Sequence, residues 1–349
     1  METLALTTRL VWGGDALDAL GELEGLRVLV VSDGFWMKNG RAEEIARRTK
    51  AAKTEIFGEV SGEPDLKLVA RGVVALERLD AQAVVALGGG SAMDCAKALG
   101  WCAGRKVRLW CIPTTAGTGS EVTAFSVLTD SEKGVKYPLV DPSLVPETAV
   151  LDKGFLAGVP GEVTAYTGLD VLTHAVEAYV AKGANPFTDA LAEYASVNAY
   201  RRITDAVAGD LEARGELLMC STLAGIAFNR AGLGVCHALA HSLGGRLHLP
   251  HGKINGVLLP KAIQANAQAP KAAKKYARLA GLMGLTPSPR TLASGMARLG
   301  KRLGLPETLP GPVDVGTVAR DARQDFCFSG NPIAFTEKQL EGMIREVVR

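Results

Sequence analysis

The stretch AVVALGGGSAMDCAKAL, residues 83–99, decides the fold class of this 349-residue chain. A short valine-rich run, typical of a buried strand, leads directly into three glycines and then into a helical pattern. Unpaired N–H groups at a helix N-terminus bind phosphate, and glycines let the backbone approach a ligand closely. The spacing matches neither the Gly-x-Gly-x-x-Gly nor the Gly-x4-Gly-Lys-Ser/Thr motif, so an ordinary strand-to-helix turn explains the triplet equally well.

Predicted strands and helices also alternate on both sides of this stretch. Strands are predicted at residues 27–33, 53–57 and 108–115, and helices at residues 40–50 and 66–79. Such alternation predicts a parallel sheet covered by helices, in a Rossmann-like α/β domain over residues 1–153.

From residue 154 to residue 349 the pattern is helical and strand-like runs are nearly gone. Helices are predicted at residues 164–182, 186–205, 209–231, 235–247 and 254–267. We therefore expect an all-α second domain, as the length of the chain already favours two domains over one.

Composition excludes several classes of protein. A net charge of +2 argues against nucleic acid as the main partner, because binding to phosphates needs a basic face. No run reaches the ~18 apolar residues of a membrane-spanning helix, so no membrane partner is expected. The six cysteines are scattered and form no Cys-x-x-Cys pair, as expected for reduced thiols in a cytoplasmic enzyme.

A second loop, PTTAGTGSEVT (residues 113–123), also follows a predicted strand and is rich in hydroxyl groups and glycine. Either loop alone could be an ordinary turn, but the two together favour nucleotide binding. Asp33 ends the strand at residues 27–33, where an acid commonly accepts ribose hydroxyls and favours NAD over NADP. A turn or helix-capping role for Asp33 remains an alternative.

All five histidines lie between residues 174 and 251. Asp170 and His174 are four residues apart, as are His237 and His241, and His251 follows a bend expected at Pro250. On a helix that spacing places both members of a pair on one face. A lone pair of this kind is more often structural, but two pairs with a further histidine favour a metal site. One carboxylate with several imidazoles suits iron, zinc, cobalt or nickel rather than calcium.

With these motifs the sequence resembles the iron-containing (group III) alcohol dehydrogenase family. The segments that carry the resemblance are GGGSAMDCAKALG, IPTTAGTGSEVTAFSVLTD with KYPLVDPSLVPETAVLD, TGLDVLTHAVEAYVA, and GVCHALAHSLGGRLHLPHGKINGVLLP. They span roughly residues 84–260, and SGNP at residues 329–332 is similar to a late family motif. The resemblance implies a dehydroquinate synthase-like fold, with the active site in the cleft between the two domains.

The resemblance also implies the roles of individual residues. The metal ligands fall on Asp170, His174, His237 and His251, with Fe²⁺ favoured over Zn²⁺. His241 falls beside the nicotinamide and the substrate, as a catalytic proton relay. The implied NAD contacts are Asp33, Gly89, Gly90, Ser91, Asp94, Thr114, Thr115, Thr118 and Lys136.

The implied reaction interconverts a short primary alcohol and its aldehyde by hydride transfer to and from NAD at a divalent metal. A polyol, lactaldehyde or hydroxy-acid dehydrogenase of the same fold is an alternative, and so is a non-catalytic scaffold protein. A sugar-phosphate lyase of related fold fits the LDVLTHAVEAY and PHGK segments less well. Family members are commonly dimers or larger, so a homodimer or larger homo-oligomer is expected.

Overall fold

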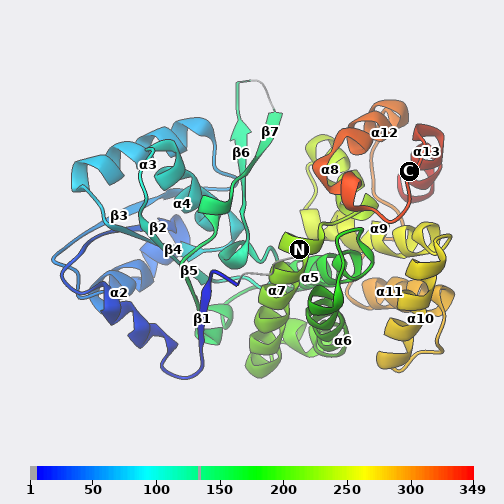
Figure 1. Cartoon of the computed structure of the whole chain (residues 1–349), viewed down its shortest axis with the longest axis horizontal. Coiled ribbons are helices and arrows are strands. Elements are labelled where there is room, and N and C mark those ends of the chain that lie inside the picture. Colours follow the sequence, from blue (N-terminus) through cyan, green and yellow to red (C-terminus); the bar gives the residue numbers. More distant parts are fainter. Residues whose placement is uncertain (1–5, 133–134) are drawn as a thin grey trace. The chain divides into compact units, whose positions relative to one another are not determined.

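A parallel sheet organises the first of two structural units, Met1–Gly158 and Val159–Arg349 (Figure 1). This computed structural model describes residues 6–132 and 135–349, without the side chains of residues 135 and 136. The sheet has the strand order β1-β8-β5-β4-β2-β3, and all neighbouring strands are parallel. Its strands are β1 (Arg9–Trp12), β2 (Arg27–Asp33), β3 (Lys53–Val60), β4 (Ala83–Gly88), β5 (Arg108–Pro113) and β8 (Thr148–Leu151).

The strand order changes direction at β2. Strand β3 lies on one side of β2, and β4, which comes next in the sequence, lies on the other side. In open α/β sheets such a change of direction leaves a crevice at the carboxyl ends of the two neighbouring strands, here β2 and β4, and ligands commonly bind there. Asp33 at the end of β2 and the glycines after β4 lie at this position.

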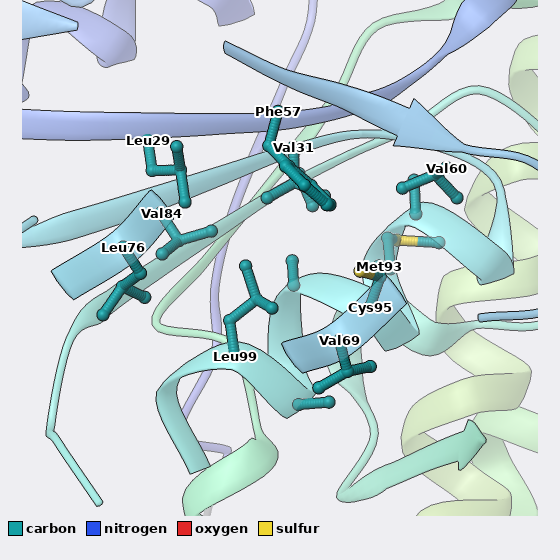
Figure 2. Packing of buried hydrophobic residues seen from close by; sticks show 14 of the residues in the cluster. Leu29, Val31, Phe57, Val60, Val69, Leu76, Val84, Met93, Cys95 and Leu99 are labelled. Carbon is teal, nitrogen blue, oxygen red and sulfur yellow. The ribbon is translucent and has the colours of Figure 1, made fainter. Parts of the chain in front are cut away.

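Both faces of the sheet are buried, which explains why its strands read as continuous apolar runs. Leu29, Val31 and Val84 pack on one face against α3 (Leu66–Leu79) and α4 (Gly90–Cys102), as Figure 2 shows. The alternate residues Val28 and Val30 pack on the other face, in a core shared with two further helices. These are the 3₁₀ helix η1 (Ala16–Leu23) and α2 (Arg41–Arg48).

Several shorter elements complete the first unit. The antiparallel hairpin of β6 and β7 was not predicted from the sequence, and neither were β1 and β8. The elements are α1 (Gly34–Lys38), η2 (Ser120–Val122), β6 (Phe125–Asp130), β7 (Val135–Val140), η3 (Pro142–Leu144) and η4 (Lys153–Leu156).

The regular elements of the second unit are all helices within its described residues, apart from one isolated parallel bridge between Leu309 and Val348, so the predicted fold class is confirmed. Its elements are α5 (Gly161–Val180), α6 (Pro186–Val207), α7 (Leu211–Ala231), α8 (Val235–Leu247), α9 (His251–Asn266), α10 (Pro270–Leu282), α11 (Pro289–Arg302), α12 (Val315–Gln324), η5 (Phe326–Gly330) and α13 (Glu337–Val347). Within the described residues no single helix is long and apolar enough to cross a membrane, although the bent pair α7 and α8 together passes that test by length and composition.

The start of α9 corrects one prediction. The helix begins at His251, with Pro250 as its N-cap, rather than at residue 254. Proline is tolerated at a helix start because the first N–H groups have no partner within the helix. The predicted bend at Pro250 therefore places His251 in the first turn of a helix.

Candidate functional site

Asp33 lies at the carboxyl end of β2 with one carboxylate oxygen engaged and the other turned towards the glycine turn. Its Oδ1 accepts hydrogen bonds from the backbone N–H groups of Phe35, at 2.9 Å, and Trp36, at 3.2 Å. A Cβ atom built on Gly88 would lie 3.5 Å from its Oδ2. Asp33 thus caps α1, which was the alternative role predicted for it from the sequence. Its second carboxylate oxygen still lies beside the glycine turn.

A side chain at any of the three glycines in the turn after β4 would crowd a neighbouring side chain. Gly88 has a φ of +157°, and a Cβ there would lie 2.6 Å from the Cβ of Ala92. A Cβ on Gly89 would lie 3.1 Å from Thr115 Oγ1, and one on Gly90 would lie 2.9 Å from Thr118 Cγ2. The two loops predicted to bind the nucleotide are therefore in contact, and Ser91 follows them in the first turn of α4.

The same two loops are joined by a hydrogen bond and by a buried residue. The backbone N–H of Thr114 donates to the carbonyl of Gly88 at 3.1 Å, and the Thr114 side chain is buried. Lys136, the last of the predicted NAD contacts, is on β7, and its side chain lies outside the described part of the structure.

Asp94 and Lys97, one turn apart on α4, fix the loop that follows β5. Asp94 Oδ1 accepts from the Ser120 hydroxyl at 2.7 Å, and its Oδ2 accepts from the N–H of Val127 at 3.0 Å. Lys97 Nζ donates to the carbonyls of Thr123, at 2.9 Å, and Phe125, at 2.7 Å. Burial raises the pKa of Asp94, while Lys97 opposes that shift. Asp94 thus braces the cofactor loop, and its direct contact with a cofactor stays a prediction.

The second unit gathers the predicted metal ligands from three helices. Asp170 and His174 are buried on α5, His237 is buried on α8, and His251 begins α9. Donor atoms of Asp170, His174 and His237 all lie within 4.8 Å of one another. The Nε2 atoms of His237 and His251 are 3.7 Å and 3.6 Å from Asp170 Oδ1. All four residues therefore surround one small volume.

The donor set fits a divalent cation. His237 Nε2 is buried and has no hydrogen-bond partner, although it faces Asp170. Burial opposes ionisation of Asp170, but the imidazoles of His174, His251 and His237 hold its pKa well below the usual range. Burial favours the neutral ring of His237, but the carboxylates of Asp170 and Glu177 raise its pKa to about 9. The site therefore attracts positive charge, which a bound transition-metal ion would supply.

Glu177, which the sequence analysis missed, orients His237. Its Oε2 lies 2.7 Å from His237 Nδ1, and its Oε1 accepts the N–H of Cys236 at 2.7 Å. This carboxylate–imidazole pair directs the opposite nitrogen, Nε2, towards Asp170, as in many metal sites. A signal was present, because Glu177 is three residues after His174 and so shares its helix face.

Asn255 is a second residue that sequence reasoning missed. Its Nδ2 donates to Asp170 Oδ1 at 2.7 Å and lies 3.0 Å from His251 Nε2. Asn255 thereby joins ligands of two different helices, α5 and α9.

His241 lies at the edge of the cluster rather than at its centre. Its ring stacks on that of His251 with a centroid distance of 5.2 Å. Its Nδ1 lies 2.9 Å from Asp325 Oδ2, and the two residues are 84 positions apart in the sequence. Asp325 was not predicted, because no local spacing connects it to His241. The bond leaves His241 Nε2 available as a proton acceptor when Nδ1 carries the proton.

A parallel sheet of the nucleotide-binding type and a helical cluster of one carboxylate and three imidazoles are features of a metal-dependent enzyme that uses a nucleotide. Comparison with known sequences identifies the family of this chain. Residues 7–153 match the family described as iron-containing alcohol dehydrogenase, and residues 164–348 match the C-terminal part of the same family. The chain therefore belongs to the iron-containing alcohol dehydrogenase family, and it is an enzyme, an alcohol dehydrogenase.

Individual relatives cover nearly the whole chain. The chain is 40% identical to the 1-propanol dehydrogenase PduQ of Salmonella typhimurium, over 93% of this chain and 90% of that protein. It is 33% identical to the NAD-dependent methanol dehydrogenase of Bacillus methanolicus, over 94% of each. Among solved structures, a 1,3-propanediol oxidoreductase matches with a TM-score of 0.92 and 33% identity over 99% of both chains.

Proposed function

We propose that this enzyme interconverts a short primary alcohol, 1-propanol foremost, and its aldehyde, with NAD and Fe²⁺ as cofactors. The observation that carries the proposal is the buried, unpartnered Nε2 of His237 facing Asp170 among further imidazoles. The similarity to a 1-propanol dehydrogenase supports the choice of substrate. A diol, lactaldehyde or hydroxy acid is the alternative, and the similarity to a 1,3-propanediol oxidoreductase supports a diol.

In this proposal Asp170, His174, His237 and His251 hold the metal, and residues 154–349 form the metal-binding domain. When bound, the metal would supply Lewis acidity towards the alcohol oxygen, and NAD would supply the acceptor for a hydride. Glu177 and Asn255 keep the ligands in place, the first through His237 and the second through Asp170. Zn²⁺ suits the same donors, so metal content depends on supply as well as on the site.

His241 is the proposed proton acceptor for the alcohol hydroxyl group. Its bond to Asp325 fixes the orientation of the ring and places the proton on Nδ1, which leaves Nε2 as the acceptor. Asp325 is itself held by the N–H of Cys327 at 2.8 Å. The carboxylate thus acts through His241 as a positioning residue.

Residues 1–153 are the proposed NAD-binding domain, with Asp33, Gly89, Gly90, Ser91, Asp94, Thr114, Thr115, Thr118 and Lys136 as cofactor contacts. We further propose a cytoplasmic enzyme, which the six free cysteines support. A homodimer or larger homo-oligomer is proposed as well, since β1 is an edge strand whose outer side is unpaired among the residues that the structure describes.

The function is tested by assay of the protein with and without metal. Protein freed of metal by chelation and reloaded with Fe²⁺ under nitrogen is given NAD with methanol, ethanol, 1-propanol, 1-butanol, 1,2-propanediol, 1,3-propanediol or lactate. We expect metal-dependent NADH formation with the highest kcat/KM for 1-propanol. A higher value for a diol or for lactate would support the alternative, and no metal-dependent reaction with any substrate would overturn the proposal.

Replacing Asp33 with serine is expected to let the enzyme accept NADP. Serine keeps a capping oxygen for the N–H groups of Phe35 and Trp36 but removes the charge that repels a 2′-phosphate. The ratio of kcat/KM for NADP to that for NAD should rise at least roughly tenfold, the effect of about 1.4 kcal/mol of relieved repulsion. Steady-state assays with both cofactors measure it. Asp33→Asn, which also keeps the cap, should behave alike; an unchanged ratio in both variants would show that Asp33 is a capping residue only.

A further inference from the structure

A second cluster of metal-ligating side chains lies beside the Asp170 site. Donor atoms of His241, Asp325 and Cys327 lie within 4.8 Å of one another. His241 comes from α8, whereas Asp325 and Cys327 flank Phe326 at the start of η5. None of the three is among the ligands assigned to the catalytic metal.

The structure holds two of these donors in a defined orientation. The N–H of Cys327 donates to Asp325 Oδ1 at 2.8 Å, so that Oδ2 faces His241 Nδ1 at 2.9 Å. The Cys327 side chain is buried, while the side chain of His241 is 35% exposed. The cluster therefore has a buried thiol end and an end that an ion can reach from solvent.

The three donors are an imidazole, a carboxylate and a thiol, the mixture that zinc and cadmium select. Zn–S bonds of about 2.3 Å and Zn–N or Zn–O bonds of about 2.0 Å place tetrahedral donors roughly 3.3–3.6 Å apart. Because the donor atoms already lie within 4.8 Å of one another, shifts of side chains suffice to reach that geometry. From this geometry we infer that His241, Asp325 and Cys327 form a second metal site, which takes Zn²⁺ or Cd²⁺.

Binding at this site has a defined proton balance. The Cys327 thiol releases its proton to solvent and becomes a thiolate ligand. Burial raises the pKa of this thiol well above its ordinary value, so any ion has to compete with a tightly held proton, and only ions with high affinity for thiolate do so. His241 binds through Nδ1, and the proton of that nitrogen passes to solvent or to Nε2.

Occupancy of the site inhibits the enzyme, a consequence that, unlike the site itself, rests on the proposed function. With Nδ1 bound to the metal and Nε2 protonated, the ring of His241 has no lone pair for the proton of the alcohol. Excess zinc then lowers kcat while iron stays bound. This behaviour differs from inhibition by replacement of iron at the Asp170 site, in which iron is lost.

The test follows the thiolate–cadmium charge-transfer band in the far ultraviolet, a signal that does not depend on turnover. Cd²⁺ is titrated under nitrogen into iron-loaded enzyme, and iron release is measured in parallel. We expect a saturable band that corresponds to one thiolate per chain, with iron retained. Absence of the band at saturating Cd²⁺, or its growth only in step with iron loss, would overturn the inference.

Matched variants assign the band. Cys327→Ser should abolish it, whereas Cys236→Ser, beside His237, and Cys102→Ser, which removes the exposed thiol, should leave it unchanged. Asp325→Asn retains the thiol and should weaken Cd²⁺ binding at least about tenfold, as loss of even an outer partner of a metal site does. A band that persists in Cys327→Ser, or a binding curve that Asp325→Asn leaves unmoved, would contradict the site. The Asp325 result also decides the matter if Cys327→Ser does not fold.

Discussion

Gly252→Ala is expected to lower activity at least ~100-fold, because a misplacement of about 1 Å in a catalytic site has an effect of that size. A Cβ on Gly252 would lie 1.9 Å from the carbonyl oxygen of Tyr166 on α5. Since a carbon and a carbonyl oxygen rarely approach closer than ~3.3 Å, the start of α9 has to move outwards by more than an ångström. His251, the preceding residue, then moves away from Asp170. Iron content, Fe²⁺ affinity and kcat/KM measure the effect.

The matched control is Gly245→Ala in α8, where a Cβ meets nothing within 4 Å. Alanine is the better helix former by about 1 kcal/mol, so this variant should be at least as stable as the native enzyme and equally active. Native iron affinity in Gly252→Ala would show that α5 and α9 can separate without loss of the site. It would also argue against His251 as a ligand.

The fold class was predictable because both faces of the sheet are covered. Residues such as Val28 and Leu29 face opposite cores, so the strand is continuously apolar over residues 28–31 and stands out in the sequence. Strand β1 is short and lies at an edge, with exposed residues at both ends, and gives no such signal. The hairpin of β6 and β7 is also absent from the apolar pattern, since only one in two residues of β6 is buried.

The candidate site was predictable only where chemistry repeats at helical spacing. Asp170 and His174, like His237 and His241, share a helix face, and the resemblance to a family completed the set with His251. Tertiary partners leave no such mark, because Asn255 meets Asp170 across 85 positions and Asp325 meets His241 across 84. The close approach of Gly252 to Tyr166 is equally invisible until the helices are packed.

Glu177 is expected to be as important to the metal site as a ligand, although no metal contact is assigned to it. Glu177→Gln should weaken Fe²⁺ binding by about 10- to 100-fold, the usual loss when the partner of a metal-bound histidine changes. The amide leaves a single acceptor oxygen for the Cys236 N–H and His237 Nδ1. Glu177→Ala should go further and lower the free energy of unfolding, because each buried donor left unpaired costs about 1–3 kcal/mol. Competition with a chelator of known affinity measures the first effect, and denaturant unfolding measures the second.

Glu162→Gln is the control, because Glu162 lies in the first turn of the same helix, is exposed, and accepts a hydrogen bond from the hydroxyl of Tyr166, far from the ligands. Its iron affinity and unfolding should match those of the native enzyme. We expect Fe²⁺ affinity to fall from the native enzyme to Glu177→Gln and again to Glu177→Ala. Because glutamine fills the same volume as glutamate, a loss in Glu177→Gln shows that the carboxylate orients His237 rather than merely packing against it. If glutamine retained native affinity and only alanine lost it, the carboxylate would serve to fill space, and His237 would be held by the neighbouring helices alone.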